Sequence, residues 1–193
     1  MPAPSPDSLN ADTIVPFIAD IFARRGAEEY LGEPVTISEH MLQCAELAEQ
    51  AGADDATIAA ALLHDIGHFT HEFDADAAEQ GVDSHHEHAG ARVIERFFPP
   101  IVTDCVRYHV DAKRFLCATD PEYFAKLSDA SVLSLKLQGG PMNDDEVRAF
   151  AANPHLPAIL QVRIWDDIGK DPDHAAPPFA HFAPVLERVV RSV

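Results

Sequence analysis

The feature of this sequence that most limits its fold is the apolar run IAAALL at residues 58–63, which leads directly into His64 and Asp65. A helix that is apolar on every side has to be buried, so other elements must surround it. Burying an imidazole and a carboxylate together is costly unless something pairs with them, and a metal ion is the strongest such partner. The run therefore indicates a buried helix that carries a candidate metal site.

Helical spacing of apolar residues and helix boundary signals recur along nearly the whole chain. Thr36 and Glu39 have the spacing of a capping box, and Pro157 and Pro184 each suit a first helical turn. Residues 69–84 are polar and aperiodic, which predicts a loop, and no strand alternation or repeat is present. We expect one all-α domain over residues 1–193, with a loose segment at 1–12. The predicted helices are 13–25, 36–51, 54–64, 86–98, 101–110, 128–137, 144–152, 157–168 and 184–193.

The charge of the chain limits its partners. It has 193 residues, 32 of them acidic and 14 basic, for a net charge of −18. This excess argues against binding nucleic acid or an anionic membrane, but a few local cations could still bind a small anion. Cys44, Cys105 and Cys117 show no CxxC spacing, and the proline-rich start has no signal-peptide pattern. We expect a cytoplasmic monomer or small homo-oligomer.

Histidine is unusually frequent, with 11 copies, and several could bind a metal. His68 lies four residues after His64, on the same helical face. Imidazole with carboxylate ligation suits iron, manganese or zinc, and Asp65 could bridge two ions. The alternative is a helix end whose histidines simply face water. Further candidate ligands lie at helix ends or on apolar faces: His40, His86, His109 and Asp166.

Two of these candidates have a neighbour of the same type. His85 precedes His86, and only the register of the motif distinguishes them. Asp167 follows Asp166, and helical geometry favours Asp166 because it lies seven residues after Ile159 on one face. We expect the remaining histidines to lie at the surface or behind the ligands: His71, His85, His88, His155, His174 and His181.

The order His, His-Asp, His, His, Asp resembles that of the HD-domain superfamily, whose members are helical bundles of this size. HDIGH at residues 64–68 and HHEHAGA at 85–91 carry the resemblance. It implies a one-metal ligand set of His40, His64, Asp65 and Asp166. His86 and His109 would complete a two-metal set.

Three further stretches resemble one branch of that superfamily, the phosphonate-cleaving oxygenases with a mixed-valent di-iron centre. They are YLGE at residues 30–33, HVDAKRFLCAT at 109–119 and LQGGPM at 137–142, and the resemblance spans residues 30–171. It implies two iron ions as Fe(II)/Fe(III) and O2 as co-substrate. The implied substrate is 1-hydroxy-2-(trimethylammonio)ethylphosphonate or 1-hydroxy-2-aminoethylphosphonate, which would be cleaved to glycine betaine or glycine plus phosphate.

The resemblance also implies roles for six other residues. His68, Lys113, Ser131 and Arg163 would contact the phosphonate, and cations with a hydroxyl donor suit a tetrahedral dianion. Tyr30 would occupy an iron position until the substrate arrives, and Glu33 would bind the ammonium group. Of these, Tyr30, Glu33, His68 and Lys113 are expected to act in catalysis. Without the resemblance, Lys113 and Arg163 could be solvated charges and Tyr30 a core residue.

Two other functions compete with the oxygenase. An HD-type phosphohydrolase acting on a nucleotide or phosphate ester would use the same ligands with water as nucleophile, but would not need Tyr30 or Glu33. A non-catalytic binding module would not need the full ligand set. The trimethylammonio substrate is slightly favoured. Its quaternary ammonium cannot donate a hydrogen bond, so we expect aromatic rings to contact it as well as Glu33. The aromatic residues available for this are Phe69, Phe73, Tyr108 and Phe115.

Overall fold

The computed structural model describes residues 8–30, 33–72 and 86–190, and within these ranges it is helical without a strand. This confirms the all-α prediction. The two 3₁₀ segments are η2 (Ile66–Glu72) and η3 (Phe124–Lys126). The α-helices are α1 (Ile14–Arg25), α2 (Ile37–Gln50), α3 (Asp55–Leu63), α5 (His86–Ile94), α6 (Pro100–Thr119), α7 (Asp129–Leu137), α8 (Asp144–Ala151), α9 (Leu156–Ile168) and α10 (Phe179–Val189).

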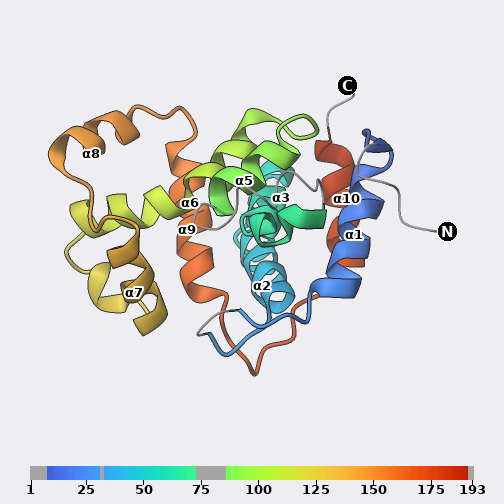
Figure 1. The fold of residues 1–193 in the computed structure, drawn as a ribbon, viewed down its shortest axis with the longest axis horizontal. Helices are drawn as coiled ribbons and strands as arrows, with labels where there is room; N and C mark the ends of the chain where they lie inside the picture. The colour runs from blue at the N-terminus through green and yellow to red at the C-terminus, as the bar shows by residue number, and fades with distance from the viewer. Residues whose placement is uncertain (1–7, 31–32, 73–85, 191–193) are drawn as a thin grey trace.

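Helix α3 is the centre of the fold, as the apolar run predicts. Every residue from Thr57 to Leu63 is buried, and α3 contacts α2, α6, α9 and α10. Figure 1 shows α3 and α2 inside the bundle, with α1 and α10 on one side and α6 and α9 on the other. Asp54 caps the start of α3, because its side chain accepts a hydrogen bond from the Thr57 amide at 2.8 Å. The helix therefore delivers His64 and Asp65 into the interior.

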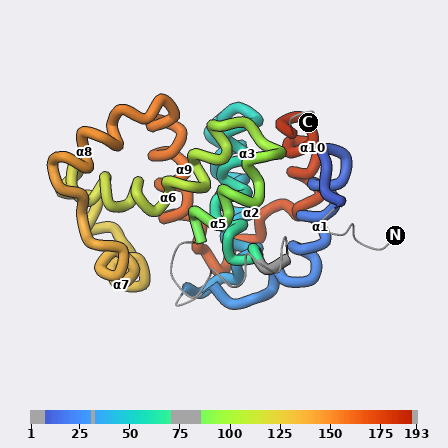
Figure 2. Tube along the Cα trace, turned by 45° about the horizontal axis from the view of Figure 1, so that its top comes forward, coloured from blue at the N-terminus to red at the C-terminus, as the bar shows by residue number. Residues whose placement is uncertain are grey.

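Helix α2 begins at the predicted capping box. The Thr36 hydroxyl accepts from the Glu39 amide at 3.2 Å, and the Glu39 carboxylate accepts from the Thr36 amide at 2.8 Å. Helices α7 and α8 lie at the end of the molecule away from α1 and α10, which both views show (Figure 2). None of the described helices is both long enough and apolar enough to cross a membrane.

Several predicted boundaries were wrong. The helix predicted at 86–98 ends at Ile94 as α5, and turns lead from there to Pro99. The helix predicted at 101–110 runs on to Thr119 as α6, because no glycine or proline occurs before Pro121 and the extension still buries Ala112 and Lys113. The helix predicted from Pro184 starts at Phe179 with Pro184 inside it. Proline costs about 3 kcal/mol inside a helix. Here that cost is opposed by the burial of an apolar face: Phe182, Val185 and Leu186.

The last of these errors concerns the predicted loop at residues 69–84. Its first residues belong to η2, and Phe69 is fully buried with its ring centroid 6.4 Å from that of Phe22. One buried aromatic residue in a polar stretch is too weak a signal to place from periodicity. Residues 73–85, which include the other half of the predicted loop and His85, lie outside the described residues.

Candidate metal centre

Five separate elements bring the six predicted metal ligands into one cluster. Five of the six side chains are buried, and His86 is partly exposed. The cluster thus joins parts of the chain that are more than a hundred residues apart. Its members are His40 on α2, His64 at the end of α3 with Asp65 next to it, His86 at the start of α5, His109 on α6 and Asp166 on α9.

Backbone carbonyls fix the tautomers of three of these histidines. The Nδ1 atoms of His40, His64 and His109 each lie 2.8 Å from a carbonyl oxygen, those of Gly169, Ala61 and Val106 respectively. A carbonyl oxygen can only accept, so each Nδ1 carries the proton and each Nε2 keeps a free lone pair. These three rings are therefore oriented as metal ligands.

The inward-facing nitrogens approach one another in two close pairs. His40 Nε2 lies 3.0 Å from His64 Nε2, and His86 Nε2 lies 3.2 Å from His109 Nε2. In the first pair both atoms carry lone pairs, which cannot form a hydrogen bond with each other, so their close approach is favourable when a cation lies between them. This geometry fits two metal ions, one for each pair.

Asp65 lies between the two pairs and turns one oxygen to each. Its Oδ2 lies 3.5 Å from the Nε2 atoms of both His40 and His64, whereas Oδ1 lies 3.2 Å from His86 Nε2 and 3.4 Å from His109 Nε2. Both oxygens are buried and accept no hydrogen bond from any described residue. A buried carboxylate whose two oxygens accept no hydrogen bond is suited to bridge two metal ions.

The structure separates Asp166 from Asp167. Asp166 Oδ1 lies 3.4 Å from His40 Nε2 and accepts no hydrogen bond from the described residues. Asp167 instead accepts from the Tyr123 hydroxyl and from Arg163. Asp166 therefore belongs to the cluster, and Asp167 supports it from behind through Arg163.

Two other residues lie beside the cluster without sharing its geometry. His68 Nε2 is 3.9 Å from Asp65 Oδ1, and its ring stacks on that of His86 with centroids 4.5 Å apart. Burial lowers the pKa of His68 to about 4, so its ring is neutral at pH 7. Cys44 lies behind His40, with Sγ 3.8 Å from Nδ1 rather than near Nε2, and it donates to the Trp165 carbonyl.

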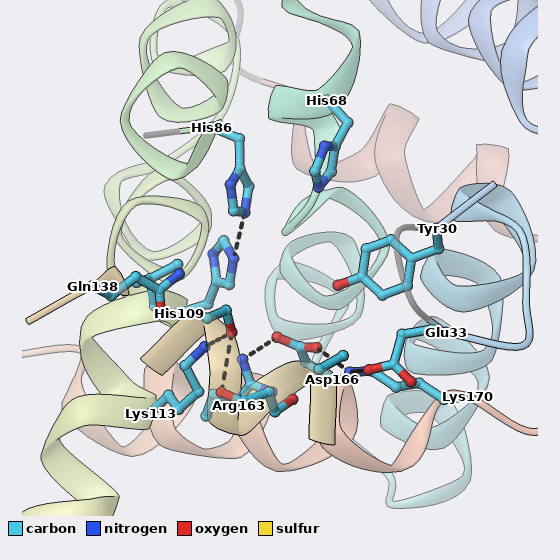
Figure 3. A pocket seen from close by; sticks show the side chains of 14 residues that line it. Tyr30, Glu33, His68, His86, His109, Lys113, Gln138, Arg163, Asp166 and Lys170 are labelled. Atoms are coloured by element: carbon cyan, nitrogen blue, oxygen red, sulfur yellow. Dashed lines mark hydrogen bonds and ion pairs between the residues drawn. The ribbon is translucent and has the colours of Figure 1, made fainter. Parts of the chain in front are cut away.

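A cavity of about 160 Å³ opens onto the cluster, and one side of it is cationic (Figure 3). Lys113 and Arg163 are both buried and line it together with Ser131. Lys113 donates to the Ser134 hydroxyl at 2.7 Å, and burial together with nearby Arg163 lowers the pKa of Lys113 to about 8. Arg163 is held in place by Asp166, whose Oδ2 lies 2.5 Å from Nη1.

The opposite side of the cavity combines a carboxylate with an aromatic ring. Figure 3 shows Tyr30, Glu33 and Lys170 across from Lys113, with the Tyr30 hydroxyl pointing into the cavity. The Tyr30 ring stacks on His40 at a centroid distance of 4.5 Å. Burial, with Asp65 and Asp166, raises the pKa of Tyr30 well above its ordinary value, so the phenol keeps its proton at neutral pH.

Sequence reasoning missed three polar residues that line this cavity: Ser134, Gln138 and Lys170. Ser134 follows Ser131 by three residues and Lys170 follows Asp166 by four, so helical spacing from a predicted residue was the available signal. That signal is weak for Lys170, because α9 ends at Ile168 before reaching it.

Several residues considered from the sequence lie elsewhere. Phe69 is in the core, and the rings of Tyr108 and Phe115 pack on Phe150 at 6.0 and 5.3 Å, away from the cluster. Phe73 lies outside the described residues, as do His85 and the side chain of His71. Three other histidines lie exposed or partly exposed and pair with acids: His155 with Asp104, His174 with Glu46 and His181 with Glu49. His88 is exposed.

Comparison with known proteins agrees with this geometry. Residues 37–144 match the model of the HD domain. The chain is 57% identical over 190 residues to the [1-hydroxy-2-(trimethylamino)ethyl]phosphonate dioxygenase (glycine-betaine-forming) of Leisingera caerulea, covering 98% of this chain and 97% of the relative. It is 43% identical over 144 residues to the hydroxymethylphosphonate dioxygenase of Gimesia maris, covering 74% and 72%. The chain therefore belongs to the HD-domain family, in the branch of that family that contains these phosphonate dioxygenases.

Proposed function

We propose that this protein is a metal-dependent dioxygenase that cleaves the C–P bond of 1-hydroxy-2-(trimethylammonio)ethylphosphonate, giving glycine betaine and phosphate. The observation that carries the proposal is the two-sided cavity beside the metal centre. Lys113 and Arg163 lie on one side and Glu33 and Tyr30 on the other. A substrate with a dianion at one end and a quaternary ammonium at the other matches this distribution of charge.

The reaction balances with one O2 per substrate. The carbon that bears the hydroxyl loses its hydrogen and its bond to phosphorus and becomes a carboxylate, and the phosphonate becomes phosphate. The two products together contain two more oxygen atoms than the substrate, and one proton is released. The names of both relatives favour this reaction over hydrolysis of a phosphate ester.

The residues on the cationic side would bind and orient the phosphonate. Arg163 offers a planar fork that is already fixed by Asp166 and Asp167, and Lys113 adds a charge that can approach from the α6 side. Ser131 and neutral His68 add hydrogen-bonding groups. Together these groups would hold the hydroxylated carbon toward the cluster.

The residues on the other side would select the substrate. Glu33 would pair with the ammonium group, and the face of Tyr30 would contact its methyl groups. We infer that Tyr30 fills the position next to the metal centre until this pairing draws it away, which would couple recognition of the substrate to exposure of the reactive site.

We further propose that the centre consists of two iron ions, one Fe(II) and one Fe(III). His40, His64 and Asp166 would hold one ion, His86 and His109 the other, and Asp65 would bridge them. The geometry that supports this is the close approach of the histidine Nε2 atoms in two pairs. The two Asp65 oxygens, which accept no hydrogen bond from the described residues, support it as well. When bound, the iron ions would supply the redox chemistry that activates O2.

The deciding experiment is anaerobic loading with Fe(II) followed by addition of O2 and a candidate substrate. We expect phosphate release with 1-hydroxy-2-(trimethylammonio)ethylphosphonate, less with the 2-amino and hydroxymethyl compounds, and none without O2. EPR spectroscopy should show a mixed-valent signal after the loaded protein has been oxidised by one electron through brief exposure to O2. Phosphate release in the absence of O2, or from phosphate esters alone, would establish the hydrolase instead.

A further inference from the structure

The side of the cavity that contains Glu33 and Tyr30, where the substrate's ammonium group would bind, already contains a cation. The ammonium group of Lys170 lies 2.9 Å from Glu33 Oε1, and the two side chains are only 11% and 8% exposed. Glu33 Oε1 also accepts from the Ser128 hydroxyl at 2.9 Å. The Lys170 Nζ lies 5.5 Å from the centroid of the Tyr30 ring, within the range of a cation–π contact. Lys170 thus has the two partners, a carboxylate and an aromatic face, that a quaternary ammonium would seek.

We propose that Lys170 is a specificity-determining residue that occupies the cation subsite of the empty enzyme and must be displaced from Glu33 by the ammonium group of the substrate. The inference rests on the proposed function, because it requires a substrate with a cationic tail. Two cations that share one largely buried carboxylate repel each other, so the substrate cannot simply join the existing pair.

The surroundings of Lys170 allow this exchange. Asp166 Oδ1 lies 4.0 Å from Nζ, and a carboxylate oxygen that binds a metal keeps a second lone pair, so the ammonium has a second acceptor within a short shift. The backbone beside Lys170 is fixed, because the Gly169 carbonyl accepts from His40. Only the flexible side chain has to move.

The exchange has a defined consequence for substrate choice. Lys170 keeps Glu33 paired when the bound phosphonate has a neutral tail, so such ligands leave no carboxylate unpaired. It also competes with cationic tails. Removing Lys170 should therefore strengthen binding of cationic ligands and weaken binding of neutral ones, and both changes raise the preference for the cation.

The test compares two ligands that differ only in charge. One is 1-hydroxy-2-(trimethylammonio)ethylphosphonate, and the other carries a tert-butyl group in place of the trimethylammonium. Their dissociation constants are measured without O2, on iron-loaded wild type and on Lys170→Met, so that no turnover is needed. We expect the ratio of the neutral to the cationic constant to rise about tenfold in Lys170→Met. Effects on the phosphonate end cancel in this ratio.

Two further variants control for charge and folding. Lys170→Arg retains a competing cation and should keep the ratio within about threefold of wild type. Lys126→Met makes the same charge change at an exposed position and should not alter the ratio. A ratio in Lys170→Met within about twofold of wild type, or loss of binding of the cationic ligand by that variant, would overturn the proposal. Failure of the proposed function would show separately, as absence of O2-dependent phosphate release from wild type.

Discussion

At the scale of the residue, the centre depends on which atom each side chain turns inward. Three histidines donate from Nδ1 to the backbone and present Nε2 to the cluster, and Asp65 presents both oxygens. None of the three carbonyl acceptors requires a particular side chain, so this orientation comes from backbone geometry. The ligand atoms are therefore positioned before any metal binds, which lowers the cost of assembling the site.

Glu33 should control the affinity for the substrate without affecting the metal. In Glu33→Gln the charge that pairs with the substrate is lost, so we expect the KM for the trimethylammonio substrate to rise about 10- to 100-fold. Steady-state kinetics and iron analysis measure the two effects. Glu46→Gln, which removes a carboxylate that pairs with exposed His174, is the matched control. A KM equal to that of wild type would show that Glu33 does not bind the ammonium group of the substrate.

Lys113 should set the upper pH limit of phosphonate capture. Its pKa is lowered to about 8, so the side chain is a cation below this pH and neutral above it. We expect kcat/KM to fall as the pH rises through about 8, because this ratio reports groups of the free enzyme. In Lys113→Arg the side chain keeps its charge, so the fall should move to higher pH. If kcat/KM falls at the same pH in both proteins, a group other than Lys113 causes the fall.

The candidate ligands could be found from the sequence because each lies in a compact motif or on a helical face. The choice of Asp166 over Asp167 followed from helical register, since one residue of rotation turns a side chain about 100°. Lys170 could not be found this way. Its partner Glu33 is 137 residues away, and contacts of that kind depend on how α2 and α9 pack, which periodicity does not report.

At the scale of the element, the close approach of η2 to α5 positions Asp65 against His86. A Cβ on Gly67 would lie 1.9 Å from the His86 carbonyl oxygen, so only glycine fits there. Gly67→Ala should push the start of α5 outward and weaken the His86–His109 side of the centre. We expect iron content to fall from about two toward about one per chain, because that side loses a ligand.

Iron analysis and EPR spectroscopy test this prediction, and Gly52→Ala is its control. Gly52 has φ +71° and no atom within 4 Å of an added Cβ. The strain there should cost about 1 kcal/mol of stability without affecting the centre. Full iron content and an unchanged mixed-valent signal in Gly67→Ala would show that the two segments can separate without loss of the ligand.

Helix starts were predicted better than helix ends. Thr36, Asp54, Ser128 and Asn143 each accept a hydrogen bond from the first turn of their helix, and such caps are local chemistry that a sequence displays. The end of α6 has no side-chain cap of this kind, so the sequence did not reveal where the helix stops. The start of α10 was missed because burial of Phe182 against the core, a tertiary effect, offset the local preference of Pro184.

At the scale of the whole molecule, the metal centre should contribute to stability. Without metal, the core contains the Asp65 carboxylate, which accepts no hydrogen bond from the described residues and lies 3.2–3.5 Å from the Nε2 atoms of four histidines. Removing iron with a chelator should cost about 3 kcal/mol at a metal concentration a hundredfold above Kd, which lowers the Tm by roughly 5–10 °C. Calorimetry before and after chelation, and after refilling with Fe(II), measures this change.

A variant with an incomplete centre provides the control for chelation. His64→Ala removes one ligand of one proposed ion at the end of α3, so the same chelator should lower its Tm by clearly less than that of wild type. If wild type and His64→Ala respond equally to the chelator, the stabilising metal lies elsewhere in the molecule.

The spread of the proposed ligands along the chain has a consequence for the order of events during synthesis. They begin at His40 and end at Asp166, and the carbonyl that orients His40 belongs to Gly169. A nascent chain therefore cannot complete the proposed metal position of His40, His64 and Asp166 until α9 and the residue after it have left the ribosome. Loading of metal must follow translation of nearly the whole chain, so a protein truncated before Gly169 should be made without a complete centre, however much iron the cell contains.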